Sequence, residues 1–410
     1  MAAVSIPTPD IPGAKPPHPL RERNLRLWLT GATISLLGDQ CYAVALPWLV
    51  LQMTGSAVAM GTILMAGAIP RAVLMLMGGA MTDRISPRKV MMSTAWARTL
   101  FVGIIGTLVW FHILRIWELY ALSFAFGVAD AFSMPATSAF LPSLVQREQL
   151  VAANSVMQST AQLTTIAGPA PAGILIKVLG IAWAFFLDAI SFLFIIAALW
   201  KLPDPPPRPP VRKAVWPSIL EGIRYVYQDV PLRSLMLLAT IMNFCIVGPI
   251  GVGLAYLVKA KFGSPAVYGI AVSSAAAGGL LGALTAGVWR VRRRGILLLL
   301  ACVVIGACLG SIGLLPRLWM LATALLLMGT SSGVANVHIS AWIQQRIEPA
   351  VRGRAMSVLM LAVYGLMPVS LAVAAILVAW NLQGMFLLAG AIMVLVTAAA
   401  ALQKPVRQIE

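Results

Sequence analysis

Charged residues are scarce in this sequence of 410 residues, and acidic residues are the scarcest. Only 10% of the residues are charged, with 13 Asp and Glu against 30 Lys and Arg, whereas 60% are hydrophobic. A soluble domain normally carries about 25% charged and about 45–50% apolar residues. These proportions exclude an ordinary soluble protein and indicate an integral membrane protein that has the lipid bilayer as its surroundings.

Cysteine and the common catalytic motifs are also scarce or absent. The four cysteines lie in apolar stretches without C-x-x-C spacing, so we expect neither a disulfide framework nor a metal site. No P-loop and no nucleophile–base set occurs, so we expect no cofactor and no enzyme activity. The basic residues are dispersed over short turns without a clustered basic and aromatic face, which argues against a nucleic-acid partner.

Long apolar runs predict twelve membrane-spanning helices. Each run exceeds the length of about 18 residues that marks a spanning helix, whereas the strands of an outer-membrane barrel alternate over about 10 residues. The expected spans are residues 27–53, 58–81, 90–113, 117–141, 154–179, 182–202, 232–258, 268–288, 295–314, 318–343, 354–379 and 383–402.

A basic, proline-rich segment divides these spans into six and six. Residues 203–213 read PDPPPRPPVRK, which is typical of a stiff linker, and residues 218–227 predict a short interfacial helix. The expected organisation is a disordered tail (1–26), an N-terminal bundle (27–202), the linker with its interfacial helix (203–231), a C-terminal bundle (232–402) and a second tail (403–410). Residues 146–156 are echoed by 345–358, and two related halves imply a substrate site between them near the bilayer midplane.

The basic residues are distributed unevenly between the two sides of the membrane. Most lie in the two tails and the even-numbered connections, as the positive-inside rule requires of cytoplasmic segments. We therefore expect a multi-pass protein of the inner (plasma) membrane with both termini in the cytoplasm. The basic residues in or beside the odd-numbered connections are Arg115, Lys177, Lys259, Lys261 and Arg317.

The connection between the second and third spans carries a recognisable pattern. Residues 79–89 read GAMTDRISPRK and resemble the signature loop G-x-x-x-D-R-x-G-R-[RK] of the major facilitator superfamily, although Ser86 and Pro87 replace its usual Gly and Arg. The resemblance implies a gate between the halves, while the alternative is that the basic residues only set topology. The matching residues are Gly79, Asp83, Arg84 and either Arg88 or Lys89.

A second pattern lies within the fifth span. Residues 164–173 read TTIAGPAPAG and resemble the antiporter motif G-x-x-x-G-P-x-x-G-G of the same superfamily, with Gly168, Pro169 and Gly173 matching. Small residues permit close helix packing, and Pro169 and Pro171 free backbone carbonyls and bend the helix. The motif is enriched in exporters. The alternative is a kinked packing helix that has no bearing on the direction of transport.

Further segments narrow the resemblance to an exporter subfamily. Residues 135–145 (PATSAFLPSLV), 222–226 (GIRYV) and 353–357 (GRAMS) look like the subfamily that includes enterobactin and macrolide efflux proteins. The resemblance covers nearly the whole chain and implies an all-α fold of two pseudo-symmetric six-helix bundles. One departure is Ser123, which stands where proton-coupled drug exporters often carry an Arg.

Ionisable residues inside spans are costly, so each is a functional candidate. Asp39, Arg71 and Asp130 lie at similar distances from the expected cytoplasmic ends of their helices, roughly 15–17 Å at 1.5 Å per residue. The resemblance implies that spans one and four line the central cavity. We therefore expect Asp39, Gln40, Arg71 and Asp130 to form a proton or substrate site, with Asp39 or Asp130 protonatable. The alternative is a static Asp39–Arg71 pair.

Two further charges fall in spans that we expect at the periphery of the bundle. Arg98 in span three and Asp188 in span six would face lipid if unpaired, so we expect them to be structural and paired with each other or with a neighbouring helix.

The combined prediction is a secondary transporter that works by alternating access. We expect proton-coupled efflux of an amphipathic, drug-like or siderophore-like small molecule, by a chain that completes the fold as a monomer. Two alternatives use the same fold: an importer of a small metabolite, and a lipid or lysophospholipid flippase.

Overall fold

The computed structural model describes residues 18–205, 215–288, 294–348 and 351–402. Within these ranges the chain forms helices and no strand, and twelve helical segments are long and apolar enough to cross a membrane. The predicted all-α fold with twelve spans is therefore confirmed. The helices of the first six spans are α1 (Arg23–Thr54), α2 (Ala57–Arg84), α3 (Pro87–Trp110), α4 (Ile116–Phe140), α5 (Leu150–Ala167) with α6 (Pro169–Leu179), and α7 (Ile181–Trp200).

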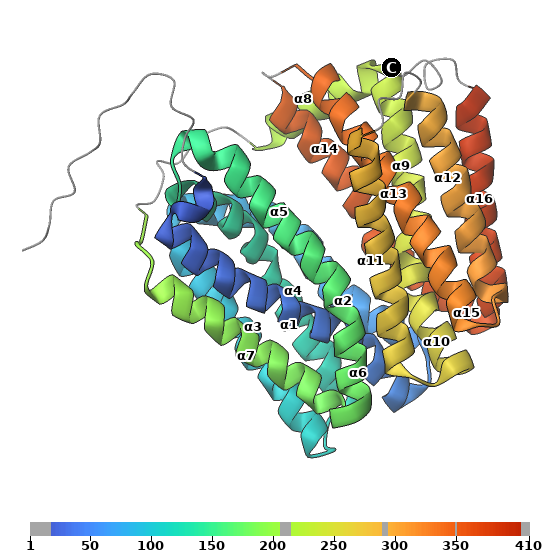
Figure 1. Ribbon diagram of the computed structural model, residues 1–410, viewed down its shortest axis with the longest axis horizontal. Helices are drawn as coiled ribbons and strands as arrows, with labels where there is room; N and C mark the ends of the chain where they lie inside the picture. The colour runs from blue at the N-terminus through green and yellow to red at the C-terminus, as the bar shows by residue number, and fades with distance from the viewer. Residues whose placement is uncertain (1–17, 206–214, 289–293, 349–350, 403–410) are drawn as a thin grey trace, which may run out of the picture.

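The remaining spans follow a helix, α8 (Val215–Gln228), that lies at one end of the molecule (Figure 1). Its bounds contain the predicted interfacial helix, and its Val226 is buried among Leu232 and Trp342. The spans are α9 (Val230–Gly248) with α10 (Ala255–Phe262), α11 (Pro265–Val288), α12 (Arg294–Ser311), α13 (Leu318–Arg346), α14 (Arg352–Tyr364) with α15 (Met367–Trp380), and α16 (Leu382–Leu402).

Spans five, seven and eleven are each interrupted near a proline. Pro169 begins α6, because proline lacks the N–H and its ring clashes with the preceding turn. Span seven contains a π-helical turn at Pro249–Leu254. There the Ser370 hydroxyl of α15 accepts a hydrogen bond from Gly248 N at 2.8 Å and donates one to Phe244 O at 2.6 Å. A side chain inserted into the backbone ladder in this way bends a helix.

The spans form two bundles, one of α1–α7 and one of α9–α16 (Figure 1). In the first bundle α1 packs on α7, α2 on α4, and α3 on both α4 and α7. In the second, α11 packs on α13, and α12 packs on α13 and α16. Between the bundles, α2 packs on α15 and α6 packs on α11.

The buried hydrophobic residues show where the two bundles meet. The largest cluster runs through both bundles and includes Trp48 of the first and Phe386 of the second. Near the start of α1 and the end of α16, which we call the terminal end, the clusters are separate: one holds Trp28 and the other holds Trp342. The bundles therefore join at the opposite end, which we call the far end, and diverge toward the terminal end (Figure 1).

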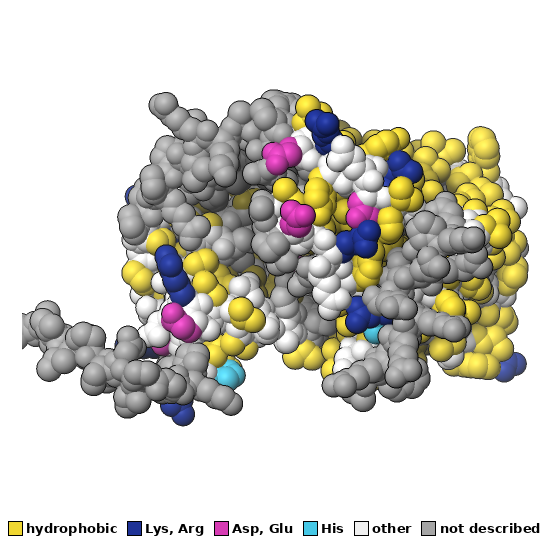
Figure 2. Space-filling view, turned by 90° about the horizontal axis from the view of Figure 1, so that it is seen from above, with side chains coloured by type: hydrophobic (Ala, Val, Ile, Leu, Met, Phe, Trp, Pro, Cys, Tyr) yellow, Lys and Arg dark blue, Asp and Glu magenta, His cyan; other side chains and the backbone are white. Residues whose placement is uncertain are grey.

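Large apolar side chains cover the flanks of the molecule. Phe124, Leu284 and Leu395 are each more than half exposed. Figure 2 views the molecule from the terminal end. Acidic and basic side chains lie on the face toward the viewer, and hydrophobic side chains lie along one flank. Such a distribution places the flanks in lipid and the terminal end in contact with water.

Candidate functional site

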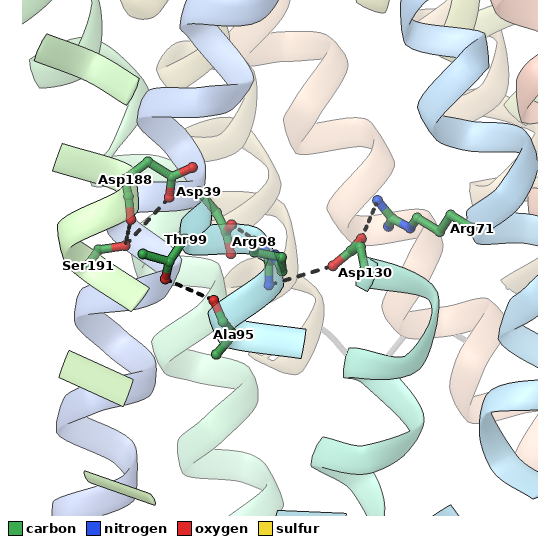
Figure 3. Close-up of polar contacts among 8 residues, drawn as sticks. All are labelled: Asp39, Arg71, Ala95, Arg98, Thr99, Asp130, Asp188 and Ser191. Carbon is green, nitrogen blue, oxygen red and sulfur yellow. Dashed lines mark hydrogen bonds and ion pairs between the residues drawn. The ribbon is translucent and has the colours of Figure 1, made fainter. Parts of the chain in front are cut away.

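Four charged side chains from four helices form a continuous chain of ion pairs inside the first bundle (Figure 3). Arg98 of α3 contacts Asp39 of α1 through its Nη2 atom. Its Nη1 atom lies 3.6 Å from Oδ1 of Asp130 on α4. The other oxygen of Asp130 lies 3.2 Å from Nη1 of Arg71 on α2. The order along the chain is therefore Asp39, Arg98, Asp130, Arg71.

The Arg98 guanidinium is the most buried member of this chain. Its side chain is 11% exposed, whereas that of Arg71 is 52% exposed. The guanidinium carbon lies 4.9 Å from the ring centre of Phe126 and 4.3 Å from that of Phe192. A guanidinium within about 6 Å of aromatic rings gains a further electrostatic attraction. Arg98 thus has both ionic and aromatic partners in the bundle interior.

Asp188 of α7 is a third carboxylate in the same region of the first bundle (Figure 3). Its side chain is completely buried, and its Oδ1 atom lies 3.5 Å from the Ser191 hydroxyl. A Cβ added to Gly38 of α1 would come within 2.8 Å of this carboxylate, so α1 can approach it closely only because residue 38 is glycine.

These contacts correct two expectations about the charges. The alternative of an Asp39–Arg71 pair is wrong for this structure, because Arg71 pairs with Asp130 instead. Span three is expected at the periphery of its bundle, but its Arg98 is directed into the bundle interior, where it pairs with Asp39 and Asp130 of neighbouring helices; the pairing with neighbouring helices is as predicted. Counting residues from the start of α3 would have placed Arg98 at the depth of the other three charges.

Gln40 packs against the break between α5 and α6. The Cβ of an alanine at Gly168 would lie 2.4 Å from Cγ of Gln40, so the glycine allows α1 to approach this break. The predicted site residue Gln40 therefore contacts the antiporter-type motif rather than the ion pairs.

The rest of this motif lies at the junction between the two bundles. A Cβ on Gly173 would lie 2.4 Å from Pro265 O, and one on Gly269 would lie 2.1 Å from Pro169 O. The backbone N–H of Ala170 donates a hydrogen bond to the Ser273 hydroxyl of α11, with an N–O distance of 3.0 Å. Among the motif residues, Pro171 is exposed. The motif thus lets α6 and α11 pack backbone against backbone.

Another contact between the bundles lies at the far end. The Lys259 ammonium of α10 donates a hydrogen bond to the backbone carbonyl of Leu51, in the last turn of α1. The last turn of α1 has no basic residue of its own, and a cation there interacts favourably with the helix dipole. Lys261, two residues on, instead bonds the carbonyls of Gly313 and Leu315 in its own bundle.

The signature loop is described only in part. The side chains of Asp83 and Arg84 and the surroundings of Gly79 lie outside what the structure describes. Arg88 donates hydrogen bonds to the carbonyls of the last two residues of α7, at 2.6 and 3.1 Å. Lys89 lies 3.6 Å from the carboxylate of Asp204. In this conformation both described residues hold the end of span six within their own bundle.

Within the described ranges, no three His, Cys, Asp or Glu side chains are grouped so as to hold a metal ion. The arrangement instead offers three carboxylates, of which Asp188 is fully buried and Asp39 and Asp130 are partly buried, and two guanidinium groups, which leaves one carboxylate in excess. An excess carboxylate of this kind can hold a proton or face a cation.

A family model described as transmembrane secretion effector, of the major facilitator type, matches residues 14–410. Two characterised proteins are similar over most of their length. The multidrug efflux pump Tap of Mycolicibacterium fortuitum is 28% identical over 370 residues, which cover 85% of this chain and 88% of Tap. The enterobactin exporter EntS of Escherichia coli is 27% identical over 335 residues, which cover 78% and 77%.

Solved structures of transporters share the fold at lower identity. A bacterial homologue of the iron transporter ferroportin, in an inward-facing state, aligns with a TM-score of 0.70 at 17% identity, covering 93% of this chain and 99% of that one. The nucleoside transporter NupG aligns with a TM-score of 0.71 at 11% identity, covering 93% and 98%.

Proposed function

Because the chain belongs to the family of transmembrane secretion effectors within the major facilitator superfamily, and is thus a membrane transporter, we propose that it exports an amphipathic small molecule in exchange for protons. The drug-like or siderophore-like character of the substrate is inferred from Tap and EntS, whose names describe a multidrug efflux pump and an enterobactin exporter. The transporter works by alternating access between two bundles.

The chain of ion pairs in the first bundle is the observation that carries this proposal. Charges inside a bilayer are costly and are retained for transport or proton relay. Asp39 and Asp130 share Arg98, so neutralising one carboxylate changes the force on the guanidinium and on the helix that bears the other. Protonation of Asp39 or Asp130 is in this way linked to the relative positions of α1, α3 and α4, with Arg71 acting on Asp130.

The end at which the two bundles separate also supports the proposal of export. The bundles are joined at the far end by the α6–α11 and α2–α15 contacts and separate toward the terminal end. With both termini on the cytoplasmic side, as the distribution of basic residues favours, the substrate site between the bundles opens to the cytoplasm. An exporter loads its substrate from that side. Residues 27–202 and 232–402 act as the two moving domains.

Drug accumulation in cells with and without the protein tests the proposal. We expect cells that contain the protein to accumulate less ethidium, an amphipathic cation, and a protonophore to abolish the difference. Ethidium efflux that persists undiminished with the protonophore would contradict proton coupling. A panel of amphipathic antibiotics and a catecholate siderophore extends the same test to the substrate class.

Two further measurements separate the alternatives. Uptake stimulated by acidic external pH would indicate an importer, and movement of a fluorescent lysophospholipid between leaflets of vesicles that contain the purified protein would indicate a flippase. Either result would replace the proposed direction or substrate.

A further inference from the structure

Asp188 differs from the other carboxylates of the first bundle because it has no cationic partner within ion-pair distance among the described residues. Its side chain is fully buried, and its Oδ2 atom has no hydrogen-bond partner there. Among the described residues its Oδ1 atom has only the Ser191 hydroxyl as a hydrogen-bond partner, at 3.5 Å, and that hydroxyl bonds the Asp188 backbone carbonyl more closely, at 2.7 Å. An ionised Asp188 would therefore lack the hydrogen bonds and the cation that stabilise a buried negative charge.

The only buried cation nearby among the described residues, Arg98, is directed toward other groups. Phe192 lies one helical turn after Asp188 on α7, and the Arg98 guanidinium carbon is 4.3 Å from its ring centre. Arg98 thus lies against the face of α7 that carries Asp188, because residues four apart share one face of a helix. Its Nη atoms nevertheless bind Asp39 and Asp130, and its buried Nε has no hydrogen-bond acceptor among the described residues.

The other ionisable groups that the structure describes around Asp188 do not neutralise it. Asp39, Cys41 and Tyr42 lie on α1, and Asp130 lies on α4. None of these groups carries a positive charge. An ionised carboxylate buried without a cation or several hydrogen bonds is far more costly than the neutral acid, which binds its proton and loses the charge.

We infer that Asp188 holds a proton in this conformation and is a proton-carrying residue of the transport cycle. The inference rests on the proposed proton coupling and adds to it a site beyond Asp39 and Asp130. When the bundles alternate, Arg98 turns from Asp130 toward Asp188. The O–H bond of Asp188 then breaks, the proton passes to water, and the carboxylate becomes the ionic partner of Arg98. The two unpartnered atoms, Nε of Arg98 and Oδ2 of Asp188, are satisfied by this exchange.

Infrared spectroscopy of the full-length protein in lipid vesicles tests the protonation without any substrate. At neutral pH we expect a carbonyl stretch of a protonated carboxyl group, and we expect Asp188→Asn to remove it. The control is Glu118→Gln, a partly exposed carboxylate that caps α4, which should leave the band unchanged. A band of the same intensity in Asp188→Asn would overturn the inference.

A second variant keeps the test decisive if Asp188→Asn does not fold. Ser191→Ala removes the hydroxyl that approaches Asp188, so the carbonyl stretch should shift in frequency. A folded Ser191→Ala protein with an unshifted band would count against Asp188 as the protonated group.

Transport measurements test the role in the cycle. In vesicles, Asp188→Asn should still exchange labelled for unlabelled ethidium but should lose accumulation driven by a pH gradient. Gradient-driven accumulation equal to that of the unmodified protein would overturn the role of Asp188. If the unmodified protein itself ignores the pH gradient, the proposed coupling fails while the infrared result still reports on Asp188, so the two failures are distinguishable.

Discussion

At the scale of single residues, Arg98 organises the interior of the first bundle. It contacts Asp39, faces Asp130 and lies against two aromatic rings, so four helices meet at one guanidinium group. Removing one partner of a buried ion pair leaves the other charges without compensation, which is more costly than the net contribution of the intact pair.

We expect Arg98→Met to destabilise the protein by about 3–5 kcal/mol, because Asp39 and Asp130 then lose their shared cation. Arg71→Met is the matched control. The Arg71 side chain is half exposed and lies at the end of the same row of ion pairs, so its loss should lower the stability by less than about 1 kcal/mol. Thermal unfolding in detergent measures both. Equal losses of stability in the two variants would contradict the stabilising role of Arg98 between Asp39 and Asp130.

Sequence reasoning found the charges of this site but not their partners. Asp39, Arg71 and Asp130 could be assigned a common depth, because helical rise depends only on residue number. The pairing of these charges with Arg98 and with each other depends on how four separate helices are rotated about their axes. The sequence does not reveal that rotation, because helices in a membrane bundle are apolar on most of their faces. The inward position of Arg98 follows from this rotation, and so does the isolation of Asp188.

At the scale of helices, the junction between α6 and α11 depends on glycines that let the two backbones touch. Gly269 faces the carbonyl of Pro169, whereas Gly287, near the end of the same helix, has open space around it. The two positions therefore separate the effect of close packing from the general effect of an alanine in α11.

We expect Gly269→Ala to weaken the junction by about 1–3 kcal/mol, since its methyl group would lie 2.1 Å from a backbone oxygen. Ethidium efflux should fall in cells that express this variant and remain unchanged for Gly287→Ala at equal expression. Equal efflux by both variants would show that the junction tolerates separation.

Lys259 offers a second test of the contacts that join the two bundles at the far end. Its ammonium group bonds α1 of the other bundle, whereas Lys261 bonds only its own bundle. We expect Lys259→Met to shift the population toward a conformation open at the far end, and Lys261→Met to leave it unchanged. Spin labels at Phe111 and Trp319, on opposite bundles in a cysteine-free background, should report longer distances for Lys259→Met only.

An unchanged distance distribution in Lys259→Met, or the same shift in both lysine variants, would remove Lys259 from the closure of the far end.

The interruptions of the spans were predictable only where the sequence marks them. Pro169 and Pro171 predict a bend in span five, and α5 ends at Ala167 beside them. The π-helical turn of span seven was not predicted. It depends on Ser370, a residue of span eleven, whose hydroxyl bridges Phe244 O and Gly248 N across the bundle interior. A contact between residues 126 positions apart cannot be read from local sequence.

At the scale of the whole molecule, hydropathy and charge predicted the twelve spans well. The apolar run lengths match the observed helices, because every backbone polar group within a bilayer must be bonded inside its own segment. The conformation could not be predicted in this way, because the same sequence adopts both the inward-open and the outward-open conformation during transport. Which end is closed depends on contacts such as those between α6 and α11.

The central claim is that export of the substrate is exchanged for protons through the carboxylates of the first bundle. The most direct measurement is proton movement in sealed vesicles that contain the purified protein and a pH-sensitive dye, after an outward or inward ethidium gradient is applied. The account predicts proton movement opposite to ethidium in the unmodified protein, and none in a variant that carries Asp39→Asn, Asp130→Asn and Asp188→Asn together. Ethidium transport without proton movement, or unchanged proton movement in the triple variant, would contradict it.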